Sequence, residues 1–342
     1  MYKRVPFNIP KEMKKALVIR PGAFGDCIII TPLFRILKEK GYHVIYHTGK
    51  RGMNVTKHNP FIDEYIEYEK EGQKNDNVDK EWKELEDSIK PDWCRNFAES
   101  IEVNISTHPK SAIYNYPKHE HHPRIKQNFY DATMEWAGFP QRGLKPELFF
   151  DKKEEKGARK YLTPNKFNIV WALAGSGHNK AYPWVDYVIG ELLKDKGIQI
   201  ITIGDERCQI LEYNDNHPNI TRLSGKTTFR ESMLLTKYAD LVVSPDTGIL
   251  HASGAFSTPK IGILGHTTRE NITKYFENDY SLEPIPEECE CAPCHKLIYD
   301  NKLQCPVENL SGASWCMHHA QPPERLYKQI RKVMDARKHS SK

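Results

Sequence analysis

The chain has 342 residues, and its 50 lysines and arginines against 45 aspartates and glutamates leave a formal net charge of +5. Dedicated nucleic-acid-binding proteins normally carry a stronger basic excess, so this balance disfavours that class. A hydrophobic content of 39% allows sizeable cores to be buried and excludes a globally disordered chain. The length is about twice that of a typical domain, so we expect two domains.

The N-terminal segment MYKRVPFNIPKEMKK is basic but lacks the apolar core of a signal peptide. The longest apolar stretch, near Cys27, is interrupted by polar residues and proline, so no segment reaches the roughly 18 apolar residues of a membrane span. We therefore expect a cytoplasmic protein, and peripheral contact with the inner face of a membrane stays open.

The first half of the chain predicts the start of a doubly wound α/β domain. The apolar run 16–20 ends at Pro-Gly, as a buried parallel strand does, and a loop over 21–25 leads into a helix from Asp26 to about Lys40. The next strand is 43–48, which completes a strand-loop-helix-strand unit. Four later segments are a surface helix within 70–90, an irregular loop over 108–126, a helix over 129–138 and a linking helix over 152–162.

The pattern restarts after a predicted hinge at Thr163–Asn165. The expected elements are strand 167–174, helix 184–196, strand 198–204, helix 229–238, strand 241–248, a helix from 249, strand 259–265 and a C-terminal helix over 323–337. We expect an N-terminal domain at 1–163, a C-terminal domain at 164–322, and a terminal helix and tail at 323–342. Two such α/β units predict an enzyme with a cleft between its domains.

The first candidate site lies at Asp26, at the predicted turn from strand to helix. Ligands of open α/β sheets bind at the carboxyl ends of the strands, and Gly22 and Gly25 would let a substrate approach the backbone. The same position suits an aspartate that only caps a helix. Spacing alone does not separate these two interpretations.

The second candidate site combines two loops of the second half. Asp246, Thr247, Gly248 and His251 follow a predicted strand and open a helix, where free backbone N–H groups favour an anion. Lys180 lies in the loop after strand 167–174. The alternatives are that Asp246 or Thr247 caps the helix and that Lys180 is a solvated surface residue.

In combination, four motifs resemble the ADP-heptose:lipopolysaccharide heptosyltransferase family, glycosyltransferase family 9. They are R-P-G-A-F-G-D, G-S-G-H-N-K-A-Y-P-W, L-S-G-K-T-T and S-P-D-T-G-I-L-H-A-S-G-A-F-S-T-P-K-I-G-I-L-G. The resemblance covers about residues 15–333. It implies a GT-B fold of two Rossmann-like domains facing a cleft, with the acceptor mainly on the first domain and the donor mainly on the second.

The resemblance also implies roles for individual residues. Asp26 would be the general base of an inverting transfer that needs no metal or other catalytic cofactor. An ADP- or UDP-linked sugar would be the donor. Its diphosphate would be bound by Lys180, Ser176, Asp246, Thr247, Gly248 and His251, and Glu206 would contact the ribose or the base.

The acceptor implied by the resemblance is a lipopolysaccharide-type glycolipid. A His- and Lys-rich loop with His119, His121 and Lys126 is locally basic and would suit an anionic acceptor. Two alternatives stay open: the same donor chemistry with a nucleic-acid or small-molecule acceptor, and a nucleotide-sugar-binding protein without turnover.

Five of the eight cysteines fall between Cys289 and Cys316. Cys291 and Cys294 form a C-x-x-C pair, and Cys305 and Cys316 follow, which suits a tetrahedral structural Zn²⁺ site. An iron-sulfur cluster, free thiols and a disulfide are the alternatives. The residues Cys289, His295, His318 and His319 are near enough in sequence to compete as ligands.

Overall fold

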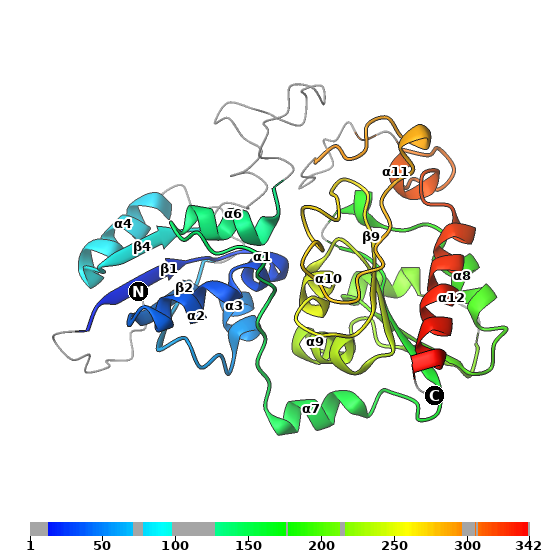
Figure 1. The fold of residues 1–342 in the computed structure, drawn as a ribbon, viewed down its shortest axis with the longest axis horizontal. Coiled ribbons are helices and arrows are strands. Elements are labelled where there is room, and N and C mark those ends of the chain that lie inside the picture. The colour runs from blue at the N-terminus through cyan, green and yellow to red at the C-terminus, as the bar shows by residue number, and fades with distance from the viewer. Residues whose placement is uncertain are drawn as a thin grey trace. The chain divides into compact units, whose positions relative to one another are not determined.

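The computed structural model describes residues 13–70, 78–97, 127–175, 177–212, 216–295, 305 and 307–340. The chain divides into two compact units (Figure 1). Among the described residues, the first unit contains 13–70, 78–97 and 129–151, and the second contains 127–128 and everything from Lys152 onward. The predicted hinge at Thr163–Asn165 therefore lies inside the second unit.

The first unit is a parallel sheet covered by helices. Its strands are β1 (Lys15–Ile19), β2 (His43–Thr48), β3 (Glu64–Glu67) and β4 (Trp93–Asn96), in the order β3-β2-β1-β4. Its helices are α1 (Phe24–Ile29), α2 (Thr31–Glu39), α3 (Lys50–Thr56), α4 (Val78–Ile89) and α6 (Phe129–Trp136). Every residue of β2 is buried, as expected for a central strand of a parallel sheet.

The single helix expected from Asp26 to Lys40 is two helices, and that expectation was wrong. The break falls at Ile30, just before Pro32. Proline has no backbone N–H to donate to the carbonyl of Ile28, and the hydroxyl of Thr31 donates to that carbonyl at 2.8 Å instead. The first helix also begins at Phe24, so Asp26 lies within its first turn.

The second unit is a larger parallel sheet. Its strands are β5 (Phe167–Ala172), β6 (Ile198–Ile203), β7 (Ile220–Arg222), β8 (Leu241–Pro245) and β9 (Lys260–Ile263), in the order β7-β6-β5-β8-β9. The α-helices are α7 (Lys152–Arg159), α8 (Val185–Leu192), α9 (Phe229–Tyr238), α10 (Gly248–Ser253), α11 (Trp315–His318) and α12 (Pro323–Ser340). Three 3₁₀ turns are η4 (His178–Lys180), η5 (Glu206–Leu211) and η6 (Pro286–Glu288).

The linking helix α7 belongs to the second unit because charged pairs fix it to α9. The guanidinium of Arg230 donates two hydrogen bonds of 2.8 Å to the carboxylate of Glu154, and Lys237 donates to Glu155 at 2.6 Å. The side chain of Arg230 is only 6% exposed, so this bidentate pair is shielded from solvent.

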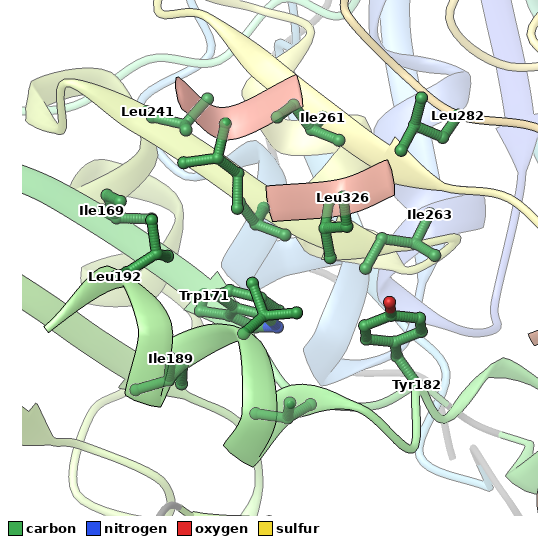
Figure 2. Packing of buried hydrophobic residues seen from close by; sticks show 14 of the residues in the cluster. Ile169, Trp171, Tyr182, Ile189, Leu192, Leu241, Ile261, Ile263, Leu282 and Leu326 are labelled. Carbon is green, nitrogen blue, oxygen red and sulfur yellow. The ribbon is translucent and has the colours of Figure 1, made fainter. Parts of the chain in front are cut away.

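The larger hydrophobic core cluster of the second unit lies between its sheet and helices α8 and α12, and a second cluster includes residues of α9 and α10. Figure 2 shows Ile169 and Trp171 of β5 converging with Ile189 of α8 and Leu326 of α12, all of them buried. The C-terminal helix α12 runs beside α8 although the two are far apart in sequence (Figure 1). Among the described residues, no helix combines the length and the apolar composition needed to cross a membrane.

Each sheet has one point at which the strand order reverses. In the first sheet this point lies between β1 and β4, and in the second it lies between β5 and β8. Open α/β sheets bind ligands outside the carboxyl ends of the strands at such a point. The segments that follow β1, β5 and β8 are therefore where a site is expected in each unit, and they carry Asp26, Lys180 and Asp246.

Candidate active site

In the first unit, the side chain of Asp26 is held by an ion pair and caps no helix. The N-cap residue of α1 is Ala23, which makes no side-chain capping bond. Nη2 of Arg20 lies 2.6 Å from Oδ1 of Asp26, and the two side chains are 5% and 23% exposed. The capping interpretation of Asp26 is therefore not realised, and its carboxylate is fixed at the end of β1 with part of its surface open to solvent.

The backbone around Asp26 depends on Gly22. The φ angle of Gly22 is +143°, a backbone conformation that residues other than glycine rarely adopt. A Cβ atom at Gly22 would lie 3.4 Å from Nη1 of Arg20 and 3.6 Å from Oδ2 of Asp26. Gly22 therefore lets the chain turn directly beside the ion pair, while Gly25 lies inside α1, one residue before Asp26.

In the second unit, Asp246 is the centre of a buried polar cluster at the carboxyl ends of β5, β8 and β9. Its Oδ2 atom lies 3.4 Å from Nζ of Lys180 and 3.4 Å from Nε2 of His266, and it accepts a hydrogen bond of 3.2 Å from Thr267. Its Oδ1 atom lies 3.7 Å from Nε2 of His251. The loops after β5 and β9, together with α10, thus supply the groups around one carboxylate.

The electrostatics of this cluster fix its charge state. Burial raises the pKa of Asp246, but Lys180, His266 and His251 more than offset that effect and lower it to about 2. Burial, with help from the charge of Lys180, lowers the pKa of His266 to about 3. At neutral pH the cluster therefore holds an ionised Asp246 and a neutral His266.

The loop after β5 packs tightly against the loop after β8, and Gly175 makes this contact. A Cβ atom at Gly175 would lie 2.8 Å from Cγ2 of Thr247 and 3.2 Å from Cδ of Lys180. Thr247 is the N-cap of α10, because its hydroxyl accepts a hydrogen bond of 3.2 Å from the backbone N–H of Ile249. The capping alternative thus holds for Thr247, and Gly248 is the first residue of that helix.

The remaining predicted donor residues have different outcomes. Glu206 begins η5, after β6, and is exposed. Gly225 of the L-S-G-K-T-T motif packs against Glu206, since a Cβ atom at Gly225 would lie 3.1 Å from Cα of Glu206. Ser176 lies outside the described residues, and so do His119, His121 and Lys126 of the acceptor-side loop.

Sequence reasoning missed His266 and Thr267. Both are buried and lie in the loop after β9, at the edge of the sheet that carries Asp246. Their position at the carboxyl end of a predicted strand was the one signal in the sequence that could have identified them.

The cysteine-rich region surrounds a small cavity in the second unit. Gly265, Ala292 and Trp315 line this cavity together with the four cysteines of the predicted metal site, Cys291, Cys294, Cys305 and Cys316. Sγ of Cys289 lies 3.5 Å from Sγ of Cys291, so Cys289 is also close to the set. Burial and the neighbouring thiols raise the pKa of Cys316 to about 12.

Two parallel doubly wound sheets, with polar clusters at their switch points, define a two-unit α/β protein of the GT-B type. A family model described as glycosyltransferase family 9 (heptosyltransferase) matches residues 103–297, more than half of the chain. The chain therefore belongs to glycosyltransferase family 9, an enzyme family, which confirms the membership expected from its motifs.

Comparison with individual proteins agrees with this assignment. The chain is 25% identical over 191 residues to the lipopolysaccharide core heptosyltransferase OpsX of Haemophilus influenzae, covering 53% of this chain and 55% of that protein. The chain thus spans about half of the length of this curated relative.

Two solved structures share the fold. The ADP-heptose lipopolysaccharide heptosyltransferase II of E. coli superposes with a TM-score of 0.66 at 14% identity, over 95% of this chain and 99% of the other. The iron-containing dodecameric glycosyltransferase TibC of enterotoxigenic E. coli gives 0.63 at 13% identity, over 95% and 77%. The expected α/β fold of GT-B type is confirmed.

Proposed function

We propose that the protein is an inverting glycosyltransferase that moves a heptose or a related sugar from a nucleoside diphosphate to an acceptor hydroxyl. The observation that carries this proposal is the cluster of Lys180, Thr267 and two histidines around Asp246 at the switch point of the second sheet. Membership in glycosyltransferase family 9 supports sugar transfer as the chemistry of that site.

The donor diphosphate would bind at the carboxyl end of β5 and β8. Lys180 supplies a positive charge there, and Thr247, Gly248 and His251 line the adjoining start of α10. Ser176 would add a phosphate contact from the same loop, and Glu206 would bind the ribose or the base. The E. coli protein of the same fold is an ADP-heptose lipopolysaccharide heptosyltransferase, which supports an ADP-linked sugar over a UDP-linked one.

Asp26 would act as the general base. It takes the proton of the acceptor hydroxyl while that oxygen forms a bond to the anomeric carbon of the sugar. The bond between that carbon and the phosphate oxygen breaks, and the nucleoside diphosphate leaves with the electron pair. Because attack and departure take place on opposite faces, the configuration inverts.

The leaving diphosphate would be stabilised by Lys180 and by backbone N–H groups, which can supply the positive charge that a metal ion provides in other transferases. Arg20 would hold the carboxylate of Asp26 through Oδ1 during the same step. Asp26 would supply the base, and Lys180 with the backbone N–H groups would stabilise the negative charge of the leaving diphosphate. We therefore propose transfer without a catalytic metal.

We propose a lipopolysaccharide-type glycolipid as the acceptor and a cytoplasmic site of action with peripheral contact at the inner membrane face. The relative OpsX, described as a lipopolysaccharide core heptosyltransferase, supports this acceptor class. Gly22 and Gly25 would shape the acceptor side of the site next to Asp26.

We further propose a structural metal at Cys291, Cys294, Cys305 and Cys316. The four residues line one cavity, and four thiolates are the ligand set that Zn²⁺ and iron accept in closed structural sites. TibC, which shares the fold, is described as iron-containing, which supports iron as well as zinc. A metal here would tie the loop down and take no part in sugar transfer.

A donor screen tests the proposed function. Thermal shift with ADP-heptose, other ADP-sugars and UDP-sugars should show stabilisation by ADP-linked sugars, and the best ligand should then be transferred to a heptose-deficient lipopolysaccharide. The absence of both binding and transfer for every nucleotide sugar would contradict the proposal.

A further inference from the structure

The cysteine-rich segment, here the described residues 289–295, 305 and 307–319, is bonded to the turn that carries Lys180. The hydroxyl of Ser314 donates a hydrogen bond of 2.8 Å to the backbone carbonyl of Asn179, the residue before Lys180. Ser314 is fully buried and Asn179 is 4% exposed, so water cannot replace this bond in the folded protein.

Two more contacts strengthen this connection. Nε1 of Trp184 donates to the carbonyl of His318 at 3.0 Å, so the chain after Lys180 is also fixed to the segment. Oγ of Ser314 lies 3.4 Å from Sγ of Cys316, one of the cysteines around the cavity. The Lys180 turn is therefore held on both sides by residues next to the cysteines.

The same segment is bonded to the loop that carries His266. The backbone N–H of His295 donates to the carbonyl of His266 at 2.7 Å. Gly265, just before His266, packs against α11 so closely that a Cβ atom there would lie 3.0 Å from Sγ of Cys316. The segment thus reaches the donor cluster from a second direction.

These two loops meet at one atom. Nζ of Lys180 and Nε2 of His266 both lie 3.4 Å from Oδ2 of Asp246. We infer that the cysteine-rich segment positions the donor site, holding Lys180 and His266 on either side of Asp246, with Ser314 as the positioning residue for Lys180. This inference rests on the proposed function, but it requires no metal at the cysteines.

The inference is tested with Ser314→Ala, which removes the hydroxyl that reaches Asn179 without adding volume. Ser311→Ala is the matched control, because Ser311 lies in the same segment, is exposed, and has hydrogen bonds to Ala313 and Glu308 of that segment. Ser314→Thr, which keeps a hydroxyl, tests rescue. For each protein the dissociation constant of ADP is measured by calorimetry, and amide hydrogen exchange is followed over residues 177–182.

In Ser314→Ala we expect ADP binding to weaken by about threefold to tenfold, the scale of one buried hydrogen bond, with faster exchange in the Lys180 turn. KM for the donor should rise more than kcat falls. Ser311→Ala should behave as wild type, and Ser314→Thr should recover part of the affinity. A purely structural role would lower the melting temperature but leave ADP affinity at the temperature of measurement unchanged.

Unchanged ADP affinity in Ser314→Ala overturns the inference, whether or not exchange becomes faster. If the wild-type protein binds no ADP, the proposed function fails instead. Slow, wild-type-like exchange over 177–182 in Ser314→Ala would then overturn the inference independently of any ligand.

Discussion

Nζ of Lys180 lies 3.4 Å from Oδ2 of Asp246, across the point where the strand order of the second sheet reverses. The two residues are 66 positions apart, and the side chain of Lys180 is only 18% exposed. The contact places a positive charge where α/β sheets bind their ligands, and we therefore propose that the diphosphate binds at this position.

Replacing Lys180 by alanine should weaken ADP binding by about tenfold or more, the loss expected for a charge-assisted contact. The substitution also removes the charge that does most to lower the pKa of Asp246, so that the carboxylate is less well compensated. Lys194→Ala is the control, because Lys194 is 70% exposed and pairs with Glu191. Equal ADP affinity in Lys180→Ala and wild type, measured by calorimetry, would contradict the proposal that Lys180 binds the donor diphosphate.

Gly175→Ala should impair donor binding although no reactive group is changed. The new Cβ atom would lie 2.8 Å from Cγ2 of Thr247, closer than carbon atoms can approach, so the two loops must separate. Gly157→Ala is the control: it lies in α7 with open space around it and should stabilise the protein by about 0.5–1 kcal/mol. Normal donor KM in Gly175→Ala would show that the spacing of the loops is unimportant.

The stability of the second unit should fall as the pH is lowered from about 6.5 to 3. The pKa of His266 is lowered from 6.5 to about 3, mainly by burial, so in this window the unfolded chain binds a proton that the folded chain does not. This residue contributes a slope of about 1.4 kcal/mol per pH unit. The pKa of Asp246 is lowered from 3.8 to about 2, so protonation of Asp246 also lowers the free energy of unfolding as the pH falls from about 4 to 2.

Denaturant unfolding of wild type and His266→Gln at pH 7, 6, 5 and 4 checks this dependence. The variant should be less stable at pH 7 but should lose less free energy of unfolding on acidification. Parallel stability curves for the two proteins would show that His266 does not titrate as its burial requires.

The purified protein should contain close to one zinc or iron per chain. Cys316→Ser should lose this metal and lower the melting temperature, because Cys316 is buried and lines the cavity. Cys94→Ser is the control, since Cys94 belongs to β4 of the first unit. The absence of stoichiometric metal from the reduced wild-type protein, measured by elemental analysis, would contradict the proposed metal site.

Much of the fold could be predicted because its central strands are apolar runs bounded by glycine, proline or charged residues. β5, β6, β8 and β9 lie within the predicted segments, and α9 has the predicted bounds, with the capping box of Thr228 and Glu231 at its start. β3 and β7 were missed, because they are only four and three residues long, and no residue of β7 is buried.

The candidate site was harder to predict because its partners meet only in the folded chain. The sequence placed Asp26 and Asp246 at the ends of strands, and the structure agrees. It could not show that Arg20 would pair with Asp26, nor that His266 would reach Asp246 from another strand. Local patterns identify which loops end at the sheet edge, but not which side chains then point toward one another.

The central claim is that Asp26 removes the proton from the acceptor hydroxyl. Asp26→Asn tests it cleanly, because the amide oxygen can still accept a hydrogen bond from Arg20 while the side chain can no longer take a proton at neutral pH. Asp87→Asn is the control, since Asp87 is 65% exposed and pairs with Lys83 on the surface of α4.

The decisive measurement is therefore the rate of sugar transfer by Asp26→Asn, made alongside the dissociation constant of ADP. We expect transfer to fall by about a hundredfold to ten-thousandfold while ADP affinity and melting temperature stay at wild-type values. Transfer at a near-normal rate by this variant would contradict the account.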